Sequence, residues 1–163
     1  AREILHQVER ILSFAPEDAL VIVNDRMDIA LITAAAGVHV GQMDLSPVDA
    51  RRILGLDRIV GVSTHSLEQA SQADQHPVDY IAFGPVFPTR TKENPDAVVG
   101  VKGLAAACSV VSKPVVAIGG IRLENAGEVL KAGAAAIAVI RDILESNDIT
   151  ARVKRWCEEL KPL

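Results

Sequence analysis

The chain has 163 residues, of which 49% are hydrophobic, so it can bury one sizeable core but is too short for two ordinary domains, and we expect a single domain over residues 1–163. Its formal net charge is −4 and its Lys and Arg residues are scattered, which argues against binding to nucleic acid or to an anionic membrane. Two widely separated cysteines, Cys108 and Cys157, and the lack of a signal-like or membrane-spanning apolar run lead us to expect a reduced, cytoplasmic protein.

Hydrophobic patterning predicts that helices and strands alternate along the chain. Short apolar runs rich in Val, Ile and Ala are typical of strands buried on both faces, and they occur at residues 19–23, 38–41, 58–62, 80–84, 114–118 and 134–140. Apolar residues at helical spacing predict helices at 2–14, 28–36, 66–73, 103–111, 124–132 and 150–160, with one more beginning at 46–47. Gly37 is expected to close the second helix, and Ser46 with Pro47 to open the third as N-cap and first helical residue.

This order gives six β-α units joined by right-handed crossovers, which form either an open doubly wound sheet or a β/α barrel. In a barrel every strand delivers its last residues to one face, whereas an open sheet concentrates its ligand contacts at one switch point. Polar or glycine residues follow every predicted strand, and the glycine-rich fingerprints of dinucleotide and nucleoside-triphosphate folds are missing. We therefore expect an α/β fold of the TIM (β/α)8-barrel type, with six of the eight units present.

The loop after the fourth strand carries Thr89, Arg90, Thr91 and Lys92 in succession. This density of hydroxyls and cations suits a phosphate or diphosphate group, and Lys92 is the first candidate for a catalytic residue. The alternative is an ordinary solvated surface loop, since loops are polar by default.

Asp25 and Asp44 follow two consecutive strands, so in a barrel their carboxylates would project over the same mouth. Mg²⁺ accepts one or two carboxylates beside substrate phosphates, and we expect these residues to hold Mg²⁺. The alternative is that both are helix N-caps.

Further candidates lie at later strand ends. Gly119 and Gly120 precede a helix and fit a phosphate cradle, which Arg141 could complete one strand later. His39 lies within a strand and is interpreted as a hydrogen-bonded core histidine, while His65 could act as an acid, a base or a capping group.

Five segments of the chain together resemble the thiamine-phosphate synthase family, in matching order and spacing over nearly the whole sequence. They are Asn-Asp-Arg at 24–26, Val-His-Val-Gly-Gln-Met-Asp at 38–44, Gly-Val-Ser-Thr-His at 61–65, Gly-Pro-Val-Phe-Pro-Thr-Arg-Thr-Lys at 84–92 and Val-Ala-Ile-Gly-Gly-Ile at 116–121. The segment at 84–92 is highly specific to that family. The resemblance implies a β/α barrel that couples an aminopyrimidine methyl diphosphate to a thiazole phosphate and releases diphosphate.

The resemblance also implies roles for individual residues. Asp25 and Asp44 would hold Mg²⁺; Asn24, Ser63 and Lys92 would bind the diphosphate, with Ser63 and Lys92 as catalytic candidates; Thr89, Thr91 and Gly120 would receive the thiazole phosphate. The implied pathway is dissociative, with diphosphate leaving before the thiazole nitrogen attacks.

Two departures from the family pattern matter. Arg141 stands where the family often has a phosphate-binding serine, and the family has two β-α units before the point where this sequence starts. Six units leave the first and last strands as open edges, so we expect the 163-residue form to associate with itself and, as a truncated barrel, to have little synthase activity. The alternatives are a thiazole tautomerase that uses His65, or a non-catalytic phosphate-binding module.

Overall fold

The computed structural model describes residues 1–91 and 96–160, and its centre is a sheet of six parallel strands in the order β1-β2-β3-β4-β5-β6. The strands are β1 (Ile22–Asn24), β2 (Gly37–Val40), β3 (Ile59–Thr64), β4 (Tyr80–Phe83), β5 (Val115–Ala117) and β6 (Ala136–Ile137). Strands that are neighbours in sequence are also neighbours in the sheet, and every pair is parallel. The predicted α/β fold with consecutive crossovers is confirmed.

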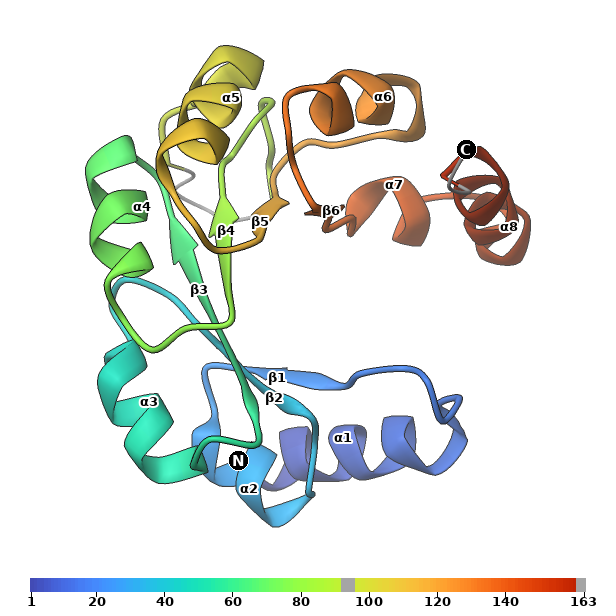
Figure 1. Ribbon diagram of the computed structural model, residues 1–163. Coiled ribbons are helices and arrows are strands. Elements are labelled where there is room, and N and C mark those ends of the chain that lie inside the picture. The colour runs from blue at the N-terminus through green and yellow to red at the C-terminus, as the bar shows by residue number, and fades with distance from the viewer. Residues whose placement is uncertain (92–95, 161–163) are drawn as a thin grey trace.

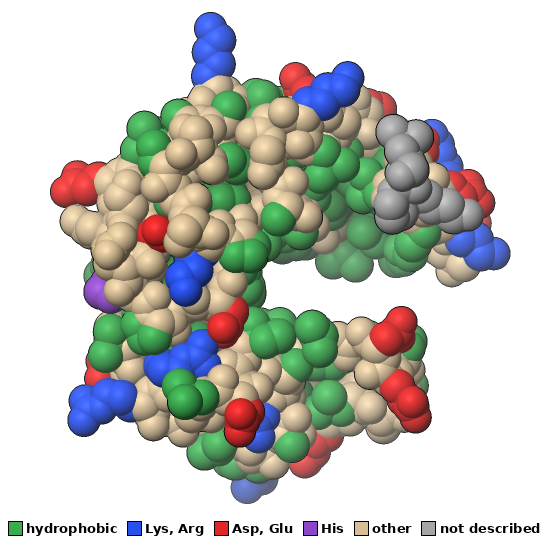
Figure 2. All heavy atoms as spheres, in the orientation of Figure 1, with side chains coloured by type: hydrophobic (Ala, Val, Ile, Leu, Met, Phe, Trp, Pro, Cys, Tyr) green, Lys and Arg blue, Asp and Glu red, His purple; other side chains and the backbone are tan. Residues whose placement is uncertain are grey.

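Helices cover the outside of this sheet, and the sheet curls into an incomplete barrel (Figure 1). The helices are α1 (Arg2–Phe14), α2 (Met27–Ile32), α3 (Pro47–Leu54), α4 (Leu67–Asp74), α5 (Gly100–Val110), α6 (Leu123–Lys131), α7 (Arg141–Leu144) and α8 (Ile149–Glu159). β1 and β6 are the two edges of the described sheet. Figure 2 shows the open side as a notch between the arm that carries α1 and the arm that carries α8. No helix within the described residues is both long and apolar enough to cross a membrane.

Local capping explains why the third and fourth helices begin where the sequence predicts. The Ser46 hydroxyl accepts a hydrogen bond from the Asp49 backbone N–H at 3.1 Å, and Pro47 occupies the first helical position of α3. Ser66 does the same for α4, accepting from Gln69 N–H at 3.2 Å. Because these caps satisfy N–H groups that have no partner inside the helix, they fix the point at which each loop ends.

The predicted role of Gly37 is wrong. The helix α2 ends at Ile32, Ala34 takes a left-handed φ of 56°, and Gly37 is the first residue of β2. A Cβ on Gly37 would lie 2.0 Å from the carbonyl oxygen of Ile59 on β3. The glycine is therefore required by close strand pairing rather than by a helix end, and an alanine-rich run that reads as helical instead forms the turn into the strand.

The sixth strand is shorter than the predicted run at 134–140. β6 has two residues and pairs only with β5 in the described sheet, and Arg141 begins the short helix α7 instead of ending a strand. Asp142 is held by Arg152 and Trp156 of α8. An edge strand has one ladder of hydrogen bonds instead of two, and contacts of the following helix then decide where the chain turns.

The core lies between the outer face of the sheet and the helices. Its buried members come mostly from strands and the inward sides of α2 to α6, with Trp156 contributed by α8. Burial of these aliphatic side chains is the main term that holds the helices on the sheet. The inner face of the curled sheet is left to line a pocket.

Candidate functional site

A pocket of about 1120 Å³ opens at the carboxyl ends of the strands. Side chains alternate between the two faces of a strand, so one residue in two points into the curl. Inward-facing strand residues that line the pocket are Asn24, His39, Ser63, Tyr80, Ala82 and Val116. They come from β1 to β5, so the site draws on almost the whole sheet, as expected for a β/α barrel.

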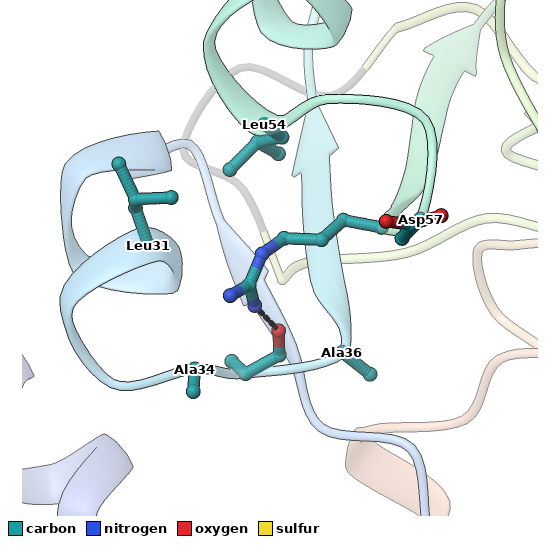
Figure 3. Close-up of a pocket in the computed structure, with 7 residues that line it drawn as sticks. Leu31, Ala34, Ala36, Leu54 and Asp57 are labelled. Atoms are coloured by element: carbon teal, nitrogen blue, oxygen red, sulfur yellow. Dashed lines mark hydrogen bonds between the residues drawn. The ribbon is translucent and has the colours of Figure 1, made fainter.

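A smaller hollow of about 510 Å³ lies at the opposite end of the sheet, where β2 and β3 begin (Figure 3). The Arg58 guanidinium occupies its wall and donates a hydrogen bond to the Ala35 carbonyl oxygen. Arg58 thereby satisfies a backbone carbonyl in the turn that follows α2. None of the residues predicted to bind substrate or metal lines this hollow.

Four inward residues lie side by side across β1 to β4. Asn24 is paired with His39, His39 with Gly61, and Gly61 with Tyr80. His39 Nδ1 is 2.9 Å from the Tyr80 hydroxyl, and His39 Nε2 is 2.8 Å from the Ser63 hydroxyl. The expectation that His39 is hydrogen-bonded is confirmed, but its ring lies in the pocket wall instead of the core between sheet and helices.

Gln42 adds a second contact to this part of the site. Its side-chain amide donates to the Ser63 carbonyl oxygen at 2.6 Å. Ser63 is thus fixed through its backbone by Gln42 and through its hydroxyl by His39. Ser63, one of the residues predicted to bind diphosphate, is therefore held by two hydrogen bonds on the inner face.

His65 connects the end of β3 to the segment after β4. Its Nδ1 donates to the Gly84 carbonyl oxygen at 2.6 Å, and its Nε2 lies 3.3 Å from an oxygen of Asp96. The Gln69 side chain accepts from the His65 backbone N–H at 2.7 Å. Both ring nitrogens therefore face acceptors, and the ring joins two segments that are distant in sequence.

The predicted phosphate segments meet although they are far apart in sequence. Val86 N–H donates to the Ile118 carbonyl oxygen at 2.9 Å, and Phe87 N–H donates to the Gly119 carbonyl oxygen at 3.1 Å. Gly120 has a φ of 68°, and a Cβ there would lie 2.6 Å from the Pro88 carbonyl oxygen. Only glycine allows the two segments to pack this closely.

Thr89 and Thr91 line the pocket beside this contact. Their hydroxyl oxygens are 3.1 Å apart, and Thr91 N–H donates to the Thr89 hydroxyl at 3.3 Å. The structure thus brings Thr89, Thr91 and Gly120 to one wall, as the sequence predicts. Lys92, the first catalytic candidate, lies outside the described residues.

Asp25 and Asp44 emerge at the ends of the paired strands β1 and β2, and both are exposed. Asp25 N–H donates to the His39 carbonyl oxygen at 2.8 Å, whereas the Asp44 carboxylate accepts from Gly41 N–H at 2.8 Å. The N-caps of α2 and α3 are Arg26 and Ser46, so the alternative that Asp25 and Asp44 are N-caps is wrong.

This arrangement fits a Mg²⁺ site of limited protein ligation. Within residues 1–91 and 96–160, no three His, Cys, Asp or Glu side chains form a cluster able to enclose a metal ion. Mg²⁺ keeps several waters and needs one or two carboxylates plus substrate phosphates, which two exposed carboxylates at neighbouring strand ends could supply. The pair stands just outside the residues that line the pocket.

Arginines lie on the side of the pocket formed by α6, α7 and α8. Arg141 lines the pocket and its Nε donates to Glu145 at 2.7 Å, so the predicted phosphate ligand is paired with the residue that caps its own helix. Arg122, next to Gly120, also lines the pocket, and in the described part of the chain it forms no ion pair. A cation at a helix N-terminus opposes the helix dipole, and this signal in the sequence could have identified it.

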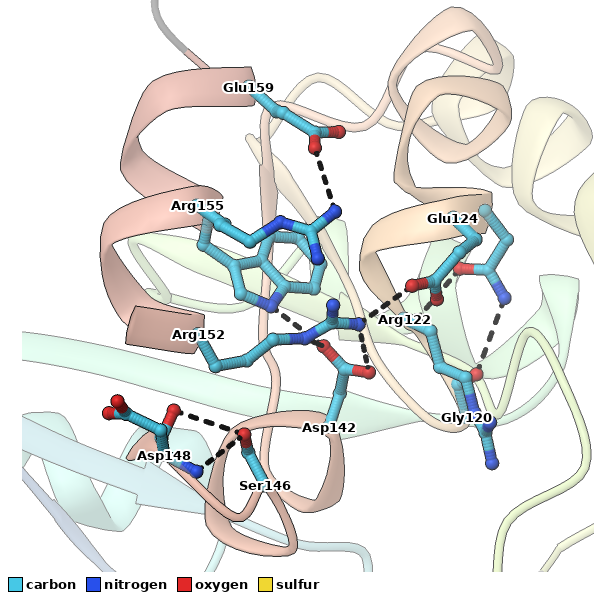
Figure 4. Close-up of polar contacts among 11 residues, drawn as sticks. Gly120, Arg122, Glu124, Asp142, Ser146, Asp148, Arg152, Arg155 and Glu159 are labelled. Atoms are coloured by element: carbon cyan, nitrogen blue, oxygen red, sulfur yellow. Dashed lines mark hydrogen bonds and ion pairs between the residues drawn. The ribbon is translucent and has the colours of Figure 1, made fainter. Parts of the chain in front are cut away.

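Arg152 joins three helices through its guanidinium (Figure 4). It donates to the two carboxylate oxygens of Asp142 at 2.9 and 2.7 Å and to Glu124 at 2.9 Å, while the Trp156 indole N–H donates to Asp142 at 2.8 Å. Hydrogen bonds to Asp142 and Glu124 raise the pKa of Arg152. Burial alone would raise the pKa of Asp142, but hydrogen bonds from Arg152 and Trp156 outweigh it and lower that pKa.

Most of the predicted substrate residues therefore share one pocket. Its lining includes Asn24, Ser63, Thr89, Thr91, Gly120 and Arg141. The sequence interpretation missed Tyr80, Arg122 and Asp96 as pocket residues. Tyr80 had a recognisable signal, because it is the single tyrosine of the chain and begins a strand of otherwise apolar residues.

Comparison with known proteins relates the whole arrangement to one family. The family model described as thiamine monophosphate synthase matches residues 1–143. A thiamine-phosphate synthase of Koribacter versatilis is 49% identical over 144 residues, covering 88% of this chain and 68% of the relative. One from Chlorobium phaeovibrioides is 48% identical over 148 residues, covering 90% of this chain and 71% of the relative.

Solved structures agree with the sequence relatives. Thiamine phosphate pyrophosphorylase from Pyrococcus furiosus superimposes with a TM-score of 0.86 at 38% identity, covering 98% of this chain and 79% of that one. A 3-hexulose-6-phosphate synthase superimposes with a TM-score of 0.73 at 19% identity, which is a likeness of fold alone.

Proposed function

The chain belongs to the thiamine monophosphate synthase family, and from this membership we propose that it joins 4-amino-2-methyl-5-pyrimidinylmethyl diphosphate to a thiazole phosphate, forming thiamine phosphate and releasing diphosphate. The observation that carries the proposal is the shared pocket. Residues that the family resemblance assigns to the two substrates, from Asn24 on β1 to Gly120 after β5, line the same cavity. A transferase that couples two phosphorylated molecules needs both within reach of each other.

The diphosphate is proposed to lie over β1 to β3. Asn24 and Ser63 offer an amide and a hydroxyl there, and Ser63 is pre-oriented by His39 and Gln42. Lys92 is assigned to the same group on the sequence pattern alone. Fixed donors that face the leaving group stabilise the charge that develops on it without reorganising, which lowers the barrier.

The second phosphate is proposed to lie on the wall formed by Thr89, Thr91 and Gly120. Two hydroxyls 3.1 Å apart and a glycine with exposed backbone can surround an anion. Arg122 and Arg141 on the same side of the pocket supply positive charge.

Asp25 and Asp44 are proposed to hold Mg²⁺, which when bound would neutralise charge on the diphosphate. The two carboxylates suit this task because they are exposed at neighbouring strand ends.

The reaction is proposed to be dissociative. The bond between the pyrimidine methylene carbon and the diphosphate oxygen breaks first, its electron pair leaves with diphosphate, and the lone pair of the thiazole nitrogen then forms the new C–N bond. Loss of the diphosphate leaves a cation centred on the pyrimidine methylene carbon. Apolar inner-wall residues such as Ala82 and Val116 line the pocket in which this cation would be held apart from bulk water.

Self-association through the open edges is proposed as a property of the 163-residue form. β1 and β6 each lack a second strand neighbour in the described sheet, and exposed apolar side chains such as Leu20 and Ile140 lie next to them in sequence. Sedimentation velocity over a dilution series should show a concentration-dependent dimer or larger species. A monomer at all concentrations would contradict this proposal.

The synthase proposal is tested by product formation from the two substrates, with Lys92→Ala as the diagnostic variant. Loss of a charged contact to the leaving group should lower kcat by about 10²-fold or more. Lys131→Ala is the matched control, because Lys131 is exposed at the end of α6 and outside the pocket. A loss below about threefold in Lys92→Ala would exclude the assigned role. Because the 163-residue form is expected to have little synthase activity, the assay uses a form that carries the two β-α units that the family has before residue 1. The absence of any product from that form, with both substrates and Mg²⁺ present, would contradict the synthase proposal.

A further inference from the structure

We propose that His39 is a positioning residue that sets the direction of the Ser63 hydroxyl, and that Tyr80 in turn fixes the tautomer of His39. The inference rests on the proposed function in one respect, that Ser63 contacts the diphosphate of the substrate. It assigns to His39 on β2 and Tyr80 on β4 the task of orienting Ser63 before the substrate binds.

The sheet register makes this chain of contacts possible. His39, Gly61 and Tyr80 are paired in one row across β2, β3 and β4. Side chains two strands apart normally cannot meet, because the residue between them fills the space. A Cβ on Gly61 would lie 2.1 Å from Cζ of Tyr80, so the tyrosine ring occupies the place of the missing side chain. The His39 and Tyr80 rings then stack with centroids 5.5 Å apart and 23° between their planes.

The hydrogen bonds assign donors and acceptors along the row. A neutral imidazole has one donor and one acceptor nitrogen. The Tyr80 phenol lies 2.9 Å from His39 Nδ1, and in the described part of the chain its hydroxyl has no second hydrogen-bond partner. Donation from the phenol O–H to Nδ1 gives that hydroxyl a partner within the protein, and burial raises the pKa of Tyr80, which keeps that proton in place.

The consequence reaches Ser63. If Nδ1 accepts, Nε2 carries the proton and donates to the Ser63 oxygen, 2.8 Å away. The Ser63 hydroxyl then accepts from His39 and does not donate to it, so its own proton is directed to the pocket that Ser63 lines. A hydroxyl prepared as a donor suits an anionic oxygen, because a hydrogen bond to a charged acceptor is stronger than one between neutral groups.

A Ser63 nucleophile activated by His39 is the competing interpretation of the same distances. General-base activation places positive charge on the imidazole, and in a catalytic triad a carboxylate at Nδ1 stabilises that charge. The group at Nδ1 here is a phenol whose pKa is raised. The arrangement therefore favours orientation of the hydroxyl over removal of its proton.

Two single substitutions separate positioning from simple space filling. His39→Gln places an amide near the position of Nε2 and can still contact Ser63, whereas His39→Asn reaches only the position of Nδ1 and leaves Ser63 without its partner. We expect His39→Asn to lower kcat roughly 10- to 100-fold, the effect of a lost hydrogen bond to a charged group, and His39→Gln to restore most of it. Equal activity of these two variants would overturn the proposal.

A double-mutant cycle tests whether His39 acts through Ser63. Once Ser63→Ala has removed the hydroxyl, His39→Asn should add less than about a twofold further loss. Independent losses that multiply would show that His39 has a separate role. Thermal unfolding of each variant identifies loss of folded protein, and His76→Asn, an exposed histidine outside the pocket, is the matched control.

The tautomer can be measured without turnover. In ¹⁵N-detected imidazole spectra of the full chain, His39 should be neutral with its proton on Nε2, and Tyr80→Phe should redistribute that proton between the two nitrogens. A His39 with its proton on Nδ1 in the unaltered chain would overturn the proposal even if synthase activity is present. If the form that carries the two additional β-α units makes no product, the proposed function fails, while the spectra still decide whether the hydrogen-bonded row is assigned correctly.

Discussion

The ring of Tyr80 lies over the α-carbon of Gly61, its paired residue on the neighbouring strand, where a Cβ would come within 2.1 Å of the ring. The pair makes room for a contact that crosses β3 and reaches His39 on β2. A glycine inside a strand usually weakens it, so its presence here indicates a close approach that the site needs.

Gly61→Ala should therefore destabilise the protein and displace Tyr80. Overpacking at a filled site costs about 1–3 kcal/mol, and we expect the free energy of unfolding in urea to fall by this amount. Gly127→Ala is the control, because Gly127 lies in α6 with no atom within 4 Å of the added Cβ. That change should stabilise the helix by about 0.5–1 kcal/mol. Equal effects at both positions would contradict the packing argument.

Gly120→Ala should weaken binding of the thiazole phosphate. The residue has a φ of 68°, and the new methyl group would meet the Pro88 carbonyl oxygen at 2.6 Å, which pushes the loop bearing Thr89 and Thr91 away. We expect a Kd that is about 5- to 150-fold higher by calorimetry, from strain of about 1–3 kcal/mol.

Gly55→Ala is the matched control for this prediction. Its φ is 78°, but no atom lies within 4 Å of the added Cβ, and the residue follows α3 outside the pocket. The strained backbone is therefore reproduced without the clash. Unchanged phosphate affinity in Gly120→Ala, or an equal loss in Gly55→Ala, would contradict the assignment.

The attachment of α8 should weaken in acid. The pKa of Asp142 is lowered by its hydrogen bonds from Arg152 and Trp156 in spite of burial, and the hydrogen bond from Arg152 lowers the pKa of Glu124. A group with a depressed pKa in the folded state contributes stability above its unfolded pKa, and this contribution is lost as pH falls through the folded value. The free energy of unfolding should therefore decrease as the pH falls below the ordinary carboxyl pKa range, where both residues take up protons.

Fluorescence of the single tryptophan reports this loss, because Trp156 is buried and bonded to Asp142. Asp142→Asn should lower the urea midpoint at neutral pH and flatten its dependence on pH. Glu159→Gln, which alters an exposed pair 3.6 Å from Arg155, should leave both nearly unchanged. A pH profile that is identical in Asp142→Asn and the unaltered chain would show that this carboxylate does not hold α8.

Asp25→Asn and Asp44→Asn should each raise the Mg²⁺ concentration needed for half-maximal activity, by at least about tenfold. Both side chains are exposed, so the free energy of unfolding should change little. Asp18→Asn, at an exposed position before β1, controls for the loss of one negative charge. An unchanged Mg²⁺ requirement in both variants would remove the metal assignment.

The order of elements could be predicted from the sequence because it depends on local patterns. Apolar runs and helical spacing located all six strands and the first helix, Arg2–Phe14, and Ser46 with Pro47 marked a helix start. Boundaries failed where tertiary pairing outweighed local propensity. Gly37 joined a strand because β3 lies close, and the chain after Ile137 turned into α7, where Arg152 and Trp156 hold Asp142.

For the site as well, some features could be predicted from the sequence and others depended on tertiary structure. Sequence motifs by themselves determined the family and the residue types suited to phosphate and Mg²⁺, because such chemistry needs hydroxyls, cations, glycines and carboxylates at strand ends. Only the tertiary structure decided that Gly120 packs on Pro88 and that Tyr80 reaches His39 across Gly61. These contacts join residues 32 and more positions apart, and their register is set by strand pairing and the curl of the sheet, which no local pattern encodes.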